Sequence, residues 1–473
     1  MPDSAMTHAP GVFAPGHLGE LTQIVPFELV DAALAAAGGH QQRLRRLPSR
    51  VIVYLLLAGA LFESMGWAQV WSRLTASLPD PPRVPSGSSI TAAMRRVGSR
   101  PLRVLFDLVK GPVATVTTHQ VVRFAGRLVV AVDGTQIPLP DTEANKVVFR
   151  KPRHGPNGQA GYPMLRLVTL IGCGTRSLIE AVFGTDQTGE LTLARDLATA
   201  MGPGMLVLAD RNFAATGFID TVAATGADFL IRAKTHATAL KLPVLARLPD
   251  GTFLSRIGEV KVRVIDAAIT VTVKDTLKHT VKNTDEGGQG DRGHREQHPY
   301  RLVTSLLDPN QTAAFDLVRL YHERWEIETS YFELKSTILA GRVLRGRHPD
   351  AVTQELWALL IAYQLLRTAM ADAILHRPDI DPDRASFTTA LNTARDQIIR
   401  AGQILAGTHV DLIGHIGTAI LQQLLPKRRT TTHARAIKRA ISKYRAKTRD
   451  TDRRTHPTSI HIAITPLPPQ PDG

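Results

Sequence analysis

Two short runs of apolar residues, each followed at once by an aspartate, set the strongest limit on how this chain of 473 residues folds. Residues 128–132 read Leu-Val-Val-Ala-Val before Asp133, and residues 205–209 read Met-Leu-Val-Leu-Ala before Asp210. A continuous apolar run of this length is typical of a strand that is buried on both faces of a sheet. Each run therefore predicts a central strand with a carboxylate at its end.

The segments around these two runs predict a mixed α/β sheet. Further strands are expected at residues 164–171, 177–183 and 228–234, and helices at 190–201 and 216–224. Three strands, a helix, a strand, a helix and a strand in that order indicate an α/β fold. Residues 235–298 contain alternating, β-branched segments, which predict a small antiparallel sheet inserted into this α/β domain.

The stretch from Gln311 to Leu339 contains neither glycine nor proline and follows the turn signal Asp308-Pro309-Asn310. It is predicted to form one helix. On a helix with 3.6 residues per turn, four polar side chains share one narrow face. They are Tyr321, Arg324, Glu328 and Lys335.

An apolar stripe runs beside this polar face and is suited to packing on a sheet. Its members are Leu320, Ile327, Leu334 and Ile338, while Glu323, Glu326 and Ser330 are predicted to point to solvent. A plainer interpretation is that Arg324 and Glu328 form an ordinary surface ion pair at i,i+4 spacing.

Three carboxylates could then meet: Asp133, Asp210 and Glu328. Oxygen ligands of this kind suit Mg²⁺ or Mn²⁺, which keep bound waters and contact phosphate oxygens. Two such ions could activate a water or a 3′-hydroxyl and stabilise the leaving oxygen, the chemistry of phosphodiester hydrolysis or strand transfer. Arg324 and Lys335 would offer positive charge to the backbone phosphates.

The charge of the chain favours a polyanionic partner. Its formal net charge is +15 and its pI is about 10.2, which points to nucleic acid ahead of membrane. The single cysteine, Cys173, excludes an intramolecular disulfide and fits a reducing compartment. Residues 51–62 are apolar but too short to span a bilayer, and the N-terminus does not read as a signal peptide. We therefore expect a cytoplasmic protein.

The first part of the chain reads as helical, with a basic helix pair near its end. Residues 86–110 predict two short helices joined at Gly98, a pattern that resembles a helix-turn-helix. Four arginines on this pair are possible DNA contacts: Arg95, Arg96, Arg100 and Arg103. Short helix pairs are also common in globular domains, so an ordinary packing role is the alternative.

The last part of the chain predicts helices at residues 351–374, 387–404 and 412–425. Residues 427–454 then carry twelve Lys or Arg against two Asp, a run that favours phosphate contacts over a merely solvated tail. The Pro-rich end after Thr465 is expected to be disordered.

The polar face described above resembles a known family. Tyr321, Arg324, Glu328 and Lys335 have the spacing of the Tyr-x2-Arg-x3-Glu-x6-Lys signature of the insertion-sequence-4 family of DDE transposases. Asp133-Gly-Thr and Asp210-Arg-Asn-Phe look like the first and second acid motifs of that family. The resemblance covers most of the chain, and the four-residue signature is its most specific part.

This resemblance implies an RNase H-like catalytic core with a β-rich insertion, an N-terminal DNA-binding domain and a helical C-terminal part. It also implies cut-and-paste transposition of an insertion sequence at terminal inverted repeats, within a protein homodimer that also binds target DNA, in a bacterial, nucleoid-associated setting. Some members excise through a hairpin with an aromatic side chain of the insertion holding a flipped base. No tryptophan lies between Trp71 and Trp325, so that pocket is not assigned.

Carried over to this chain, the resemblance gives each motif residue a role. Asp133, Asp210 and Glu328 would be the catalytic acids and would hold two Mg²⁺ or Mn²⁺ ions. The DNA phosphates near the scissile end would be contacted by Tyr321, Arg324 and Lys335.

The expected domain division is a disordered N-terminus at 1–17, a helical DNA-binding domain at 18–120, a catalytic core at 121–345 with its insertion at about 235–298, a helical region at 346–425 and a basic, Pro-rich tail at 426–473.

Three other functions share parts of this sequence pattern. A phosphatase of the haloacid dehalogenase type also has Asp-Gly-Thr, but it needs an aspartate where this chain has Ala131. An RNase H-like nuclease without strand transfer is the closer enzymatic alternative. A sequence-specific DNA-binding protein whose catalysis has decayed is the alternative from another class, although all three acids are intact.

Overall fold

The computed structural model describes residues 17–38, 45–76, 82–113, 122–152, 161–235, 240–273, 295–375, 377, 379–400, 413–426, 431–432 and 456–467. Most of the basic run 427–454 lies outside the described residues, as do residues 1–16 and 468–473. The expectations for those segments are therefore not addressed by the structure.

The described strands are β1 (Arg123–Phe124), β2 (Arg127–Pro138), β3 (Met164–Gly172), β4 (Leu178–Thr185), β5 (Met205–Ala209), β6 (Asp228–Arg232), β7 (Ala246–Arg247), β8 (Phe253–Ile257), β9 (Val260–Val273), β10 (Arg295–Thr304), β11 (Thr431–Thr432) and β12 (His456–Ile464). They form one sheet in the order β11-β12-β9-β10-β6-β5-β2-β3-β4, with β1 paired to β2, and with β8 paired to both β7 and β9. β2, β5 and β6 are parallel neighbours, and the other pairs are antiparallel. The predicted mixed α/β sheet is confirmed.

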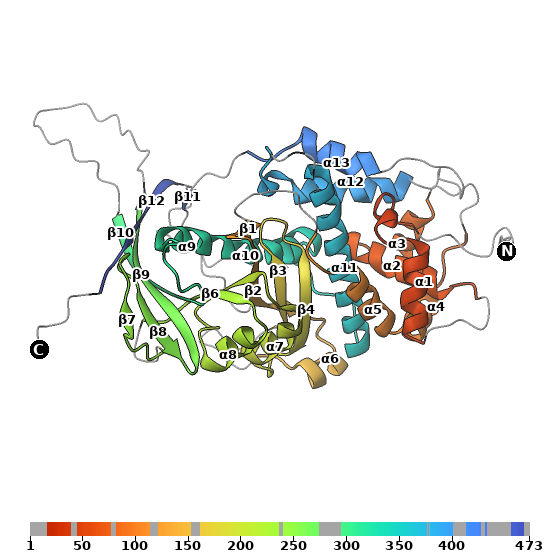
Figure 1. Cartoon of the computed structure of the whole chain (residues 1–473). Helices are drawn as coiled ribbons and strands as arrows, with labels where there is room; N and C mark the ends of the chain where they lie inside the picture. Colours follow the sequence, from red (N-terminus) through yellow and green to blue (C-terminus); the bar gives the residue numbers. More distant parts are fainter. Residues whose placement is uncertain are drawn as a thin grey trace, which may run out of the picture.

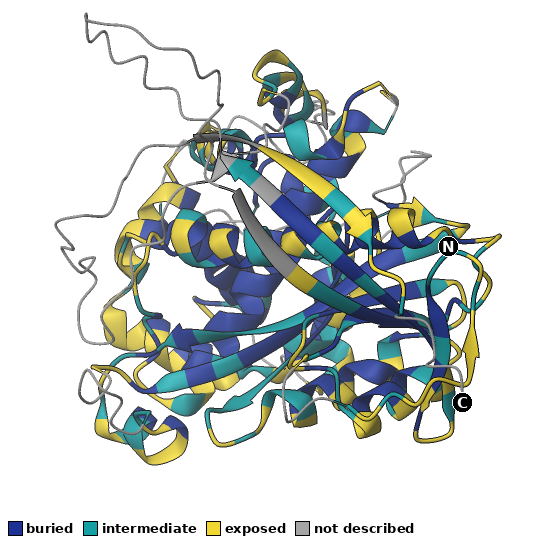
Figure 2. Ribbon diagram, turned by 90° about the vertical axis from the view of Figure 1, so that its left-hand side faces the viewer, coloured by how far each residue is buried: buried dark blue, intermediate teal, exposed yellow. Residues whose placement is uncertain are grey.

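Helices cover both faces of this sheet (Figure 1). One face carries α7 (Glu190–Asp196) and α8 (Thr216–Ala224), and the other carries α9 (Ala314–Tyr321) and α10 (Trp325–Phe332). Buried residues gather along the central strands and the helices next to them (Figure 2). The sheet is buried on both sides, as its continuous apolar strands require.

A helical bundle stands beside the sheet (Figure 1). Its members are α1 (Phe27–Ala36), α2 (Ser49–Leu61), α3 (Trp67–Leu74), α4 (Gly87–Val97), α5 (Arg100–Val109), α11 (Pro349–Ile374), α12 (Phe387–Arg400) and α13 (Ile413–Gln422). The long helix α11 starts with a proline in its first turn, where no backbone N–H is needed, and is buried along most of its length. It packs against α2 and α5 from the N-terminal part of the chain and against α12 and α13 from the C-terminal part.

No helix in the described part of the chain combines the length and the hydrophobicity that a membrane span needs. The apolar run predicted to be a buried helix is α2, in which all but one residue are buried.

The sheet differs from expectation in two respects. The strands within residues 235–298 pair antiparallel, as predicted, but they are continuous with the central sheet, because β10 starts inside this segment, runs on to Thr304 and there pairs with β6. The predicted tail contains a strand that the sequence did not predict, β12, which pairs with β9. Both differences concern which strands are neighbours, and strand neighbours are not encoded in the alternation of a single strand.

The stretch predicted as one helix is a continuous helical rod whose type changes along its length. After α9 comes a 3-10 turn at His322–Arg324, then α10, and then a π-helical segment at Glu333–Ile338. We call residues 314–338 the signature helix. The apolar stripe is buried as predicted, but Glu326 and Ser330 are buried too, because structure covers the far side of this helix as well.

Candidate active site

Asp133 and Asp210 are neighbours across two parallel strands. The pairing of β2 with β5 ends at Val132 opposite Ala209, so each aspartate is the next residue along its strand. Adjacent strands lie about 4.8 Å apart, which brings the two residues to one edge of the parallel part of the sheet. The sequence predicts that this strand ends at Asp133, but β2 does not end there. It continues to Pro138 because its pairing with β3 continues, with Asp133 opposite Thr169.

Strand alternation decides which face each aspartate uses. Val129 and Ala131 belong to the core on the side of α10, whereas Val130 and Val132 belong to the core on the side of α7 and α8. Successive side chains of a strand point to opposite faces, so Asp133 faces α10. The signature helix covers this same face.

Three contacts join the signature helix to the ends of these strands. The Tyr321 hydroxyl donates to the carbonyl of Ala209 at 3.0 Å. Arg324 Nη1 lies 3.8 Å from Asp133 Oδ2, and Lys335 Nζ donates to Thr135 Oγ1 at 3.0 Å. Within the helix, Arg324 Nη2 donates to Glu328 Oε1 at 3.1 Å. Three of the four predicted polar residues therefore reach the sheet next to a predicted aspartate, and Glu328 is paired with the arginine that contacts Asp133.

Tyr331 is a residue of this site that the sequence analysis missed. Its hydroxyl donates to the carbonyl of Asp133 at 2.5 Å and lies 2.9 Å from Thr169 Oγ1, so it ties the signature helix to the strand pair that carries Asp133. A buried tyrosine in an apolar setting is ordinarily assigned to the core. The only local signal was its hydroxyl, which needs a partner when it is buried.

Burial dominates the electrostatics of the site. It raises the pKa of Asp133 to about 7, against the opposing effects of the Gly134 amide and Arg324, while Asp210 and Glu190 raise it further. Burial alone would lower the pKa of Arg324, but Tyr321, Glu328 and Asp133 outweigh it and raise that pKa. Arg324 Nε is buried without a hydrogen-bond partner among the described residues. The side chains of Asp133 and Arg324 are therefore shielded from most of the solvent.

Carboxylate oxygens form the donor set that hard divalent cations prefer, so the residue types fit a magnesium or manganese site. Within the described residues, however, no group of three or more His, Cys, Asp or Glu side chains forms a metal site as it stands. The Arg324 guanidinium contacts both Asp133 and Glu328, so a positive group already lies between two of the three acids. The three acids as metal ligands remain a prediction.

A fourth acid lies against the other face of β2. Glu190, the first residue of α7, packs so closely on Gly134 that a Cβ at that position would lie 2.0 Å from Glu190 Oε1. Burial raises the pKa of Glu190, and the neighbouring Asp210 raises it further. Glycine in the Asp-Gly-Thr motif thus leaves room for the Glu190 carboxylate, which would have to move if a Cβ were added.

The four N-terminal arginines divide into two pairs. Arg96 donates to the carbonyl of Leu47 at 2.6 Å, and Arg103 lies over the ring of Trp357 and pairs with Glu180. These two are engaged in packing between helices. Arg95 and Arg100 are exposed and line a cavity of about 1030 Å³ between α4, the start of α5 and the start of α11.

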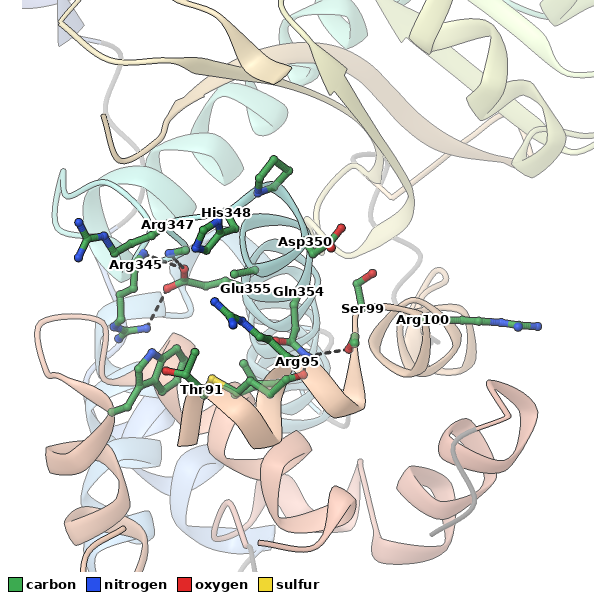
Figure 3. Close-up of a pocket in the computed structure, with 17 residues that line it drawn as sticks. Thr91, Arg95, Ser99, Arg100, Arg345, Arg347, His348, Asp350, Gln354 and Glu355 are labelled. Carbon is green, nitrogen blue, oxygen red and sulfur yellow. Dashed lines mark hydrogen bonds and ion pairs between the residues drawn. The ribbon is translucent and has the colours of Figure 1, made fainter. Parts of the chain in front are cut away.

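This cavity has a basic side that comes from two distant segments. Its lining also includes Arg345, Arg347 and His348, from the loop that follows the signature helix. In Figure 3, Arg95 is directed toward Gln354 and Glu355, whereas Arg100 extends away from the other labelled residues. Arg345 is paired with Glu355 at 3.0 Å. Arg347 is exposed at the rim, so Arg95 and Arg347 are the cations best placed for an outside partner.

Comparison with known proteins gives consistent matches over nearly the whole chain. Residues 15–107 match the family model of the insertion element 4 transposase N-terminal region, and residues 124–365, more than half of the chain, match the transposase DDE domain. The transposase InsG for insertion sequence element IS4 of Escherichia coli (strain K12) is 26% identical over 442 residues, which are 88% of this chain and 91% of InsG.

Two further similarities have smaller weight. The putative transposase InsZ of Escherichia coli (strain K12) is 24% identical over 196 residues, which are 40% of this chain and 62% of InsZ. Among solved structures, the cryo-EM structure of the piggyBac transposase synaptic complex with hairpin DNA aligns with 86% of this chain and 85% of its own chain, at 11% identity and a TM-score of 0.41.

Proposed function

Because the chain belongs to the DDE transposases of the insertion-sequence-4 family, we propose that Asp133, Asp210 and Glu328 are its catalytic acids and its metal ligands. The protein is a transposase, an enzyme that cuts DNA and joins it by strand transfer, and its core is RNase H-like. The closeness of the three acids supports these roles. Arg324 contacts both Asp133 and Glu328, and Asp210 lies beside Asp133 across β2 and β5.

The transposase DDE domain depends on divalent metal ions, and we propose two Mg²⁺ or Mn²⁺ ions in this chain. Bound there, they would lower the pKa of an attacking water or 3′-hydroxyl and stabilise the leaving oxygen. The protein supplies a half-buried carboxylate, Asp133, on a strand that is paired on both sides. Low solvent exposure strengthens every charge interaction at this edge of the sheet.

Three residues of the signature helix are proposed to position the DNA backbone. Arg324 can hold a phosphate with two parallel hydrogen bonds, and Lys335 supplies a point charge on the same face. Tyr321 is buried and its hydroxyl donates to the Ala209 carbonyl, so we propose that it acts on the DNA through Arg324, whose guanidinium lies over its ring. Binding of a phosphate by Arg324 would release Asp133 and Glu328 from their contact with it.

The protein binds DNA, and we propose that it acts on the terminal inverted repeats of its own element as a homodimer. Arg95 and Arg347 are proposed DNA contacts because they are exposed on the basic side of the cavity. Arg96 and Arg103 are weaker candidates, since both already bond to protein groups.

The domain division is kept as part of the proposal, with one change to the role of the tail. Residues 18–120 would bind DNA, residues 121–345 would catalyse the reaction, and residues 346–425 would support both. Within the tail, β12 belongs to the sheet of the core. A nucleoid-associated location follows from the DNA substrate and is proposed on that ground.

The test is cleavage of duplex DNA that carries the ends of the element, taken from the sequence that flanks this reading frame. With Mg²⁺ or Mn²⁺, the protein should nick or excise this DNA, and Glu328→Gln should abolish cleavage while DNA binding stays unchanged. The reason is that glutamine keeps the shape but loses the negative charge that a metal ligand needs. Loss of a catalytic metal ligand is expected to cost at least about 1000-fold in rate.

The matched control is Asp316→Asn, the same chemical change at an exposed position of α9. It should cleave like the unaltered protein. Equal cleavage by Glu328→Gln would refute the assignment. Cleavage of any duplex without strand transfer would favour the nuclease, and specific binding without cleavage would favour a decayed transposase.

A further inference from the structure

A buried ionic cluster lies on the side of the signature helix that is turned away from Glu328. We call it the Arg176 cluster, and its members come from the β3–β4 turn, the signature helix, α11 and the 3-10 turn at Pro382–Arg384. They are Arg176, Glu326, Glu333, Tyr363, Arg367 and Asp383. None of these residues has a predicted role in the candidate active site.

Arg176 is the centre of the cluster, because it bonds to two acids of the signature helix and to a third acid from the 3-10 turn at Pro382–Arg384. Its Nε donates to Glu326 Oε2 at 2.6 Å and its Nη2 donates to Glu326 Oε1 at 3.3 Å, so the contact is bidentate. Its Nη1 donates to Glu333 Oε1 at 3.1 Å, and Nη2 also donates to Asp383 Oδ1 at 2.5 Å. Glu326 is completely buried.

The second oxygen of Glu333 is held from α11. Glu333 Oε2 accepts a bond from the Tyr363 hydroxyl at 3.1 Å and is paired with Arg367. The Tyr363 hydroxyl also lies 3.2 Å from the carbonyl of Arg176. Glu326 and Glu333 are therefore each held by several bonds to parts of the chain outside this helix.

The backbone of Arg176 is itself in an unusual conformation. Its φ is +53°, in the left-handed region that residues other than glycine adopt rarely. Such a conformation persists where the surroundings hold it, and it is more frequent at functional sites. Arg176 belongs to the turn between β3 and β4, and β3 is the strand that pairs with Asp133. The cluster thus connects the strand next to the catalytic aspartate with the helix that carries Glu328.

The spacing along the signature helix gives the cluster a geometric effect. Glu326 comes two residues before Glu328, and Glu333 comes two residues before Lys335. Residues two apart on a helix lie about 200° apart around its axis, whereas residues seven apart lie nearly in line. Two clamped glutamates on one side therefore fix the rotation of the helix about its axis and leave Glu328 on the opposite side.

We propose that Arg176 is a positioning residue of the transposase, which sets the rotation of the signature helix and thereby holds Glu328 and Lys335 against β2. This inference rests on the proposed role of Glu328. A purely stabilising role is a poor explanation, because buried ion pairs seldom stabilise a fold more than apolar residues of the same volume would. Arg176 acts through the helix and touches neither DNA nor the reacting atoms.

The test uses two conservative variants. Arg176→Lys keeps the positive charge but loses the fork that binds Glu326 with two bonds. Glu326→Asp keeps the negative charge but shortens the side chain, and it serves as the test should the lysine variant not fold. Aspartate rather than glutamine is chosen at Glu326 because it keeps the negative charge that pairs with Arg176.

Arg263→Lys is the matched control. Arg263 is fully buried in β9, donates to Thr252 and Thr312 and pairs with Asp250, so this variant also removes the fork of a buried arginine. Its partners belong to the β-rich part and to the loop before α9. Any general cost of such a change should appear in this control as well.

Four quantities are measured for each variant: the melting temperature, the affinity for end-bearing DNA, the affinity for Mn²⁺ without DNA, and the single-turnover cleavage rate. We expect Arg176→Lys and Glu326→Asp to cleave roughly 10–100-fold more slowly and to bind Mn²⁺ more weakly, the usual size of an effect on ligand orientation. Their affinity for DNA should fall far less than their cleavage rate, because Lys335 is one proposed phosphate contact among several. Arg263→Lys should lose a similar amount of thermal stability and cleave like the unaltered protein.

Cleavage at the unaltered rate by both folded variants would overturn the proposal. It would also be overturned if Arg263→Lys slowed cleavage as much as Arg176→Lys for the same fall in melting temperature. If the unaltered protein did not cleave its element ends, the proposed function would have failed, and Mn²⁺ affinity would still decide whether Arg176 positions the acids.

Discussion

Asp133 and Gly134 are adjacent in β2, yet they serve opposite faces of the sheet. Asp133 faces the signature helix, where Arg324 contacts it, and Gly134 faces α7, where Glu190 occupies the space that a side chain would need. The same acidic residue type also has two different roles on one helix. Glu328 faces the strands that carry the aspartates, whereas Glu326 is buried against Arg176. At this scale, a role follows from what a side chain contacts.

Gly134→Ala should destabilise the protein by about 1–3 kcal/mol, because its Cβ would force the Glu190 side chain out of its packed position on β2. Adding Glu190→Ala should recover most of that loss by removing the clash. Urea unfolding of both single variants and of the double variant measures the coupling, which should exceed about 1 kcal/mol.

The control for this pair is Gly202→Ala, at a position where an added Cβ has open space. It should change the free energy of unfolding very little. Additive effects of Gly134→Ala and Glu190→Ala would mean that Glu190 does not make glycine necessary in the Asp-Gly-Thr motif.

At the scale of elements, the signature helix combines three kinds of helical turn. The 3-10 turn at His322–Arg324 has 3.0 residues per turn instead of 3.6, and the π-helical segment is wound more loosely. These changes lie on either side of Glu328 and adjust which way Arg324 and Lys335 point. Glu333, the first residue of the π-helical segment, is held by both Arg176 and Arg367.

The cavity between α4 and α11 also belongs to this scale, because two elements far apart in the sequence form it. We expect the double variant Arg95→Ala, Arg347→Ala to bind DNA more weakly regardless of its sequence. Its binding should depend less on salt, with a slope of log affinity against log salt that is smaller by about 2, since each lost phosphate contact removes about 0.9. Fluorescence anisotropy across a salt series measures this slope.

A double variant with the same net charge is the control: Arg73→Ala, Arg256→Ala. Both residues are exposed, on α3 and β8, outside the cavity. An equal loss of slope in the control would mean that net charge alone, and not this cavity, determines the effect.

At the scale of the whole molecule, the two ends of the chain are built into the fold. The N-terminal helices pack on α11, and β12 near the other end pairs with β9 over seven register positions from Thr458 to Ile464. β12 covers residues 267–273 of β9, a stretch that would otherwise be an open edge. Exposed apolar edge strands are sites of aggregation.

A chain shortened to end at residue 455 should therefore melt at a lower temperature and self-associate. Differential scanning calorimetry and light scattering after gel filtration measure the two effects. A chain that ends at residue 467 keeps β12 and should behave like the full chain. If the shorter chain stayed monodisperse with an unchanged melting temperature, β12 would contribute nothing to the sheet.

Much of this protein was determined by local sequence alone. Continuous apolar runs predicted the central strands, since only a strand buried on both faces needs apolar residues on both sides. The helical spacing predicted that Tyr321, Arg324, Glu328 and Lys335 share a face. Tyr321, Arg324 and Lys335 reach the sheet near Asp133 or Asp210, and Glu328 pairs with Arg324. Whether the three acids bind metal together stays a prediction.

Other features were decided only by the tertiary structure. Arg176 and Glu326 are 150 residues apart, and a charged residue is assigned to solvent until its partner is known. The continuation of β2 past Asp133 depends on β3, and the union of β9, β10 and β12 with the central sheet depends on which strands are neighbours. Periodicity reports which face of an element is buried. It does not report what covers that face, because the covering segment comes from elsewhere in the chain.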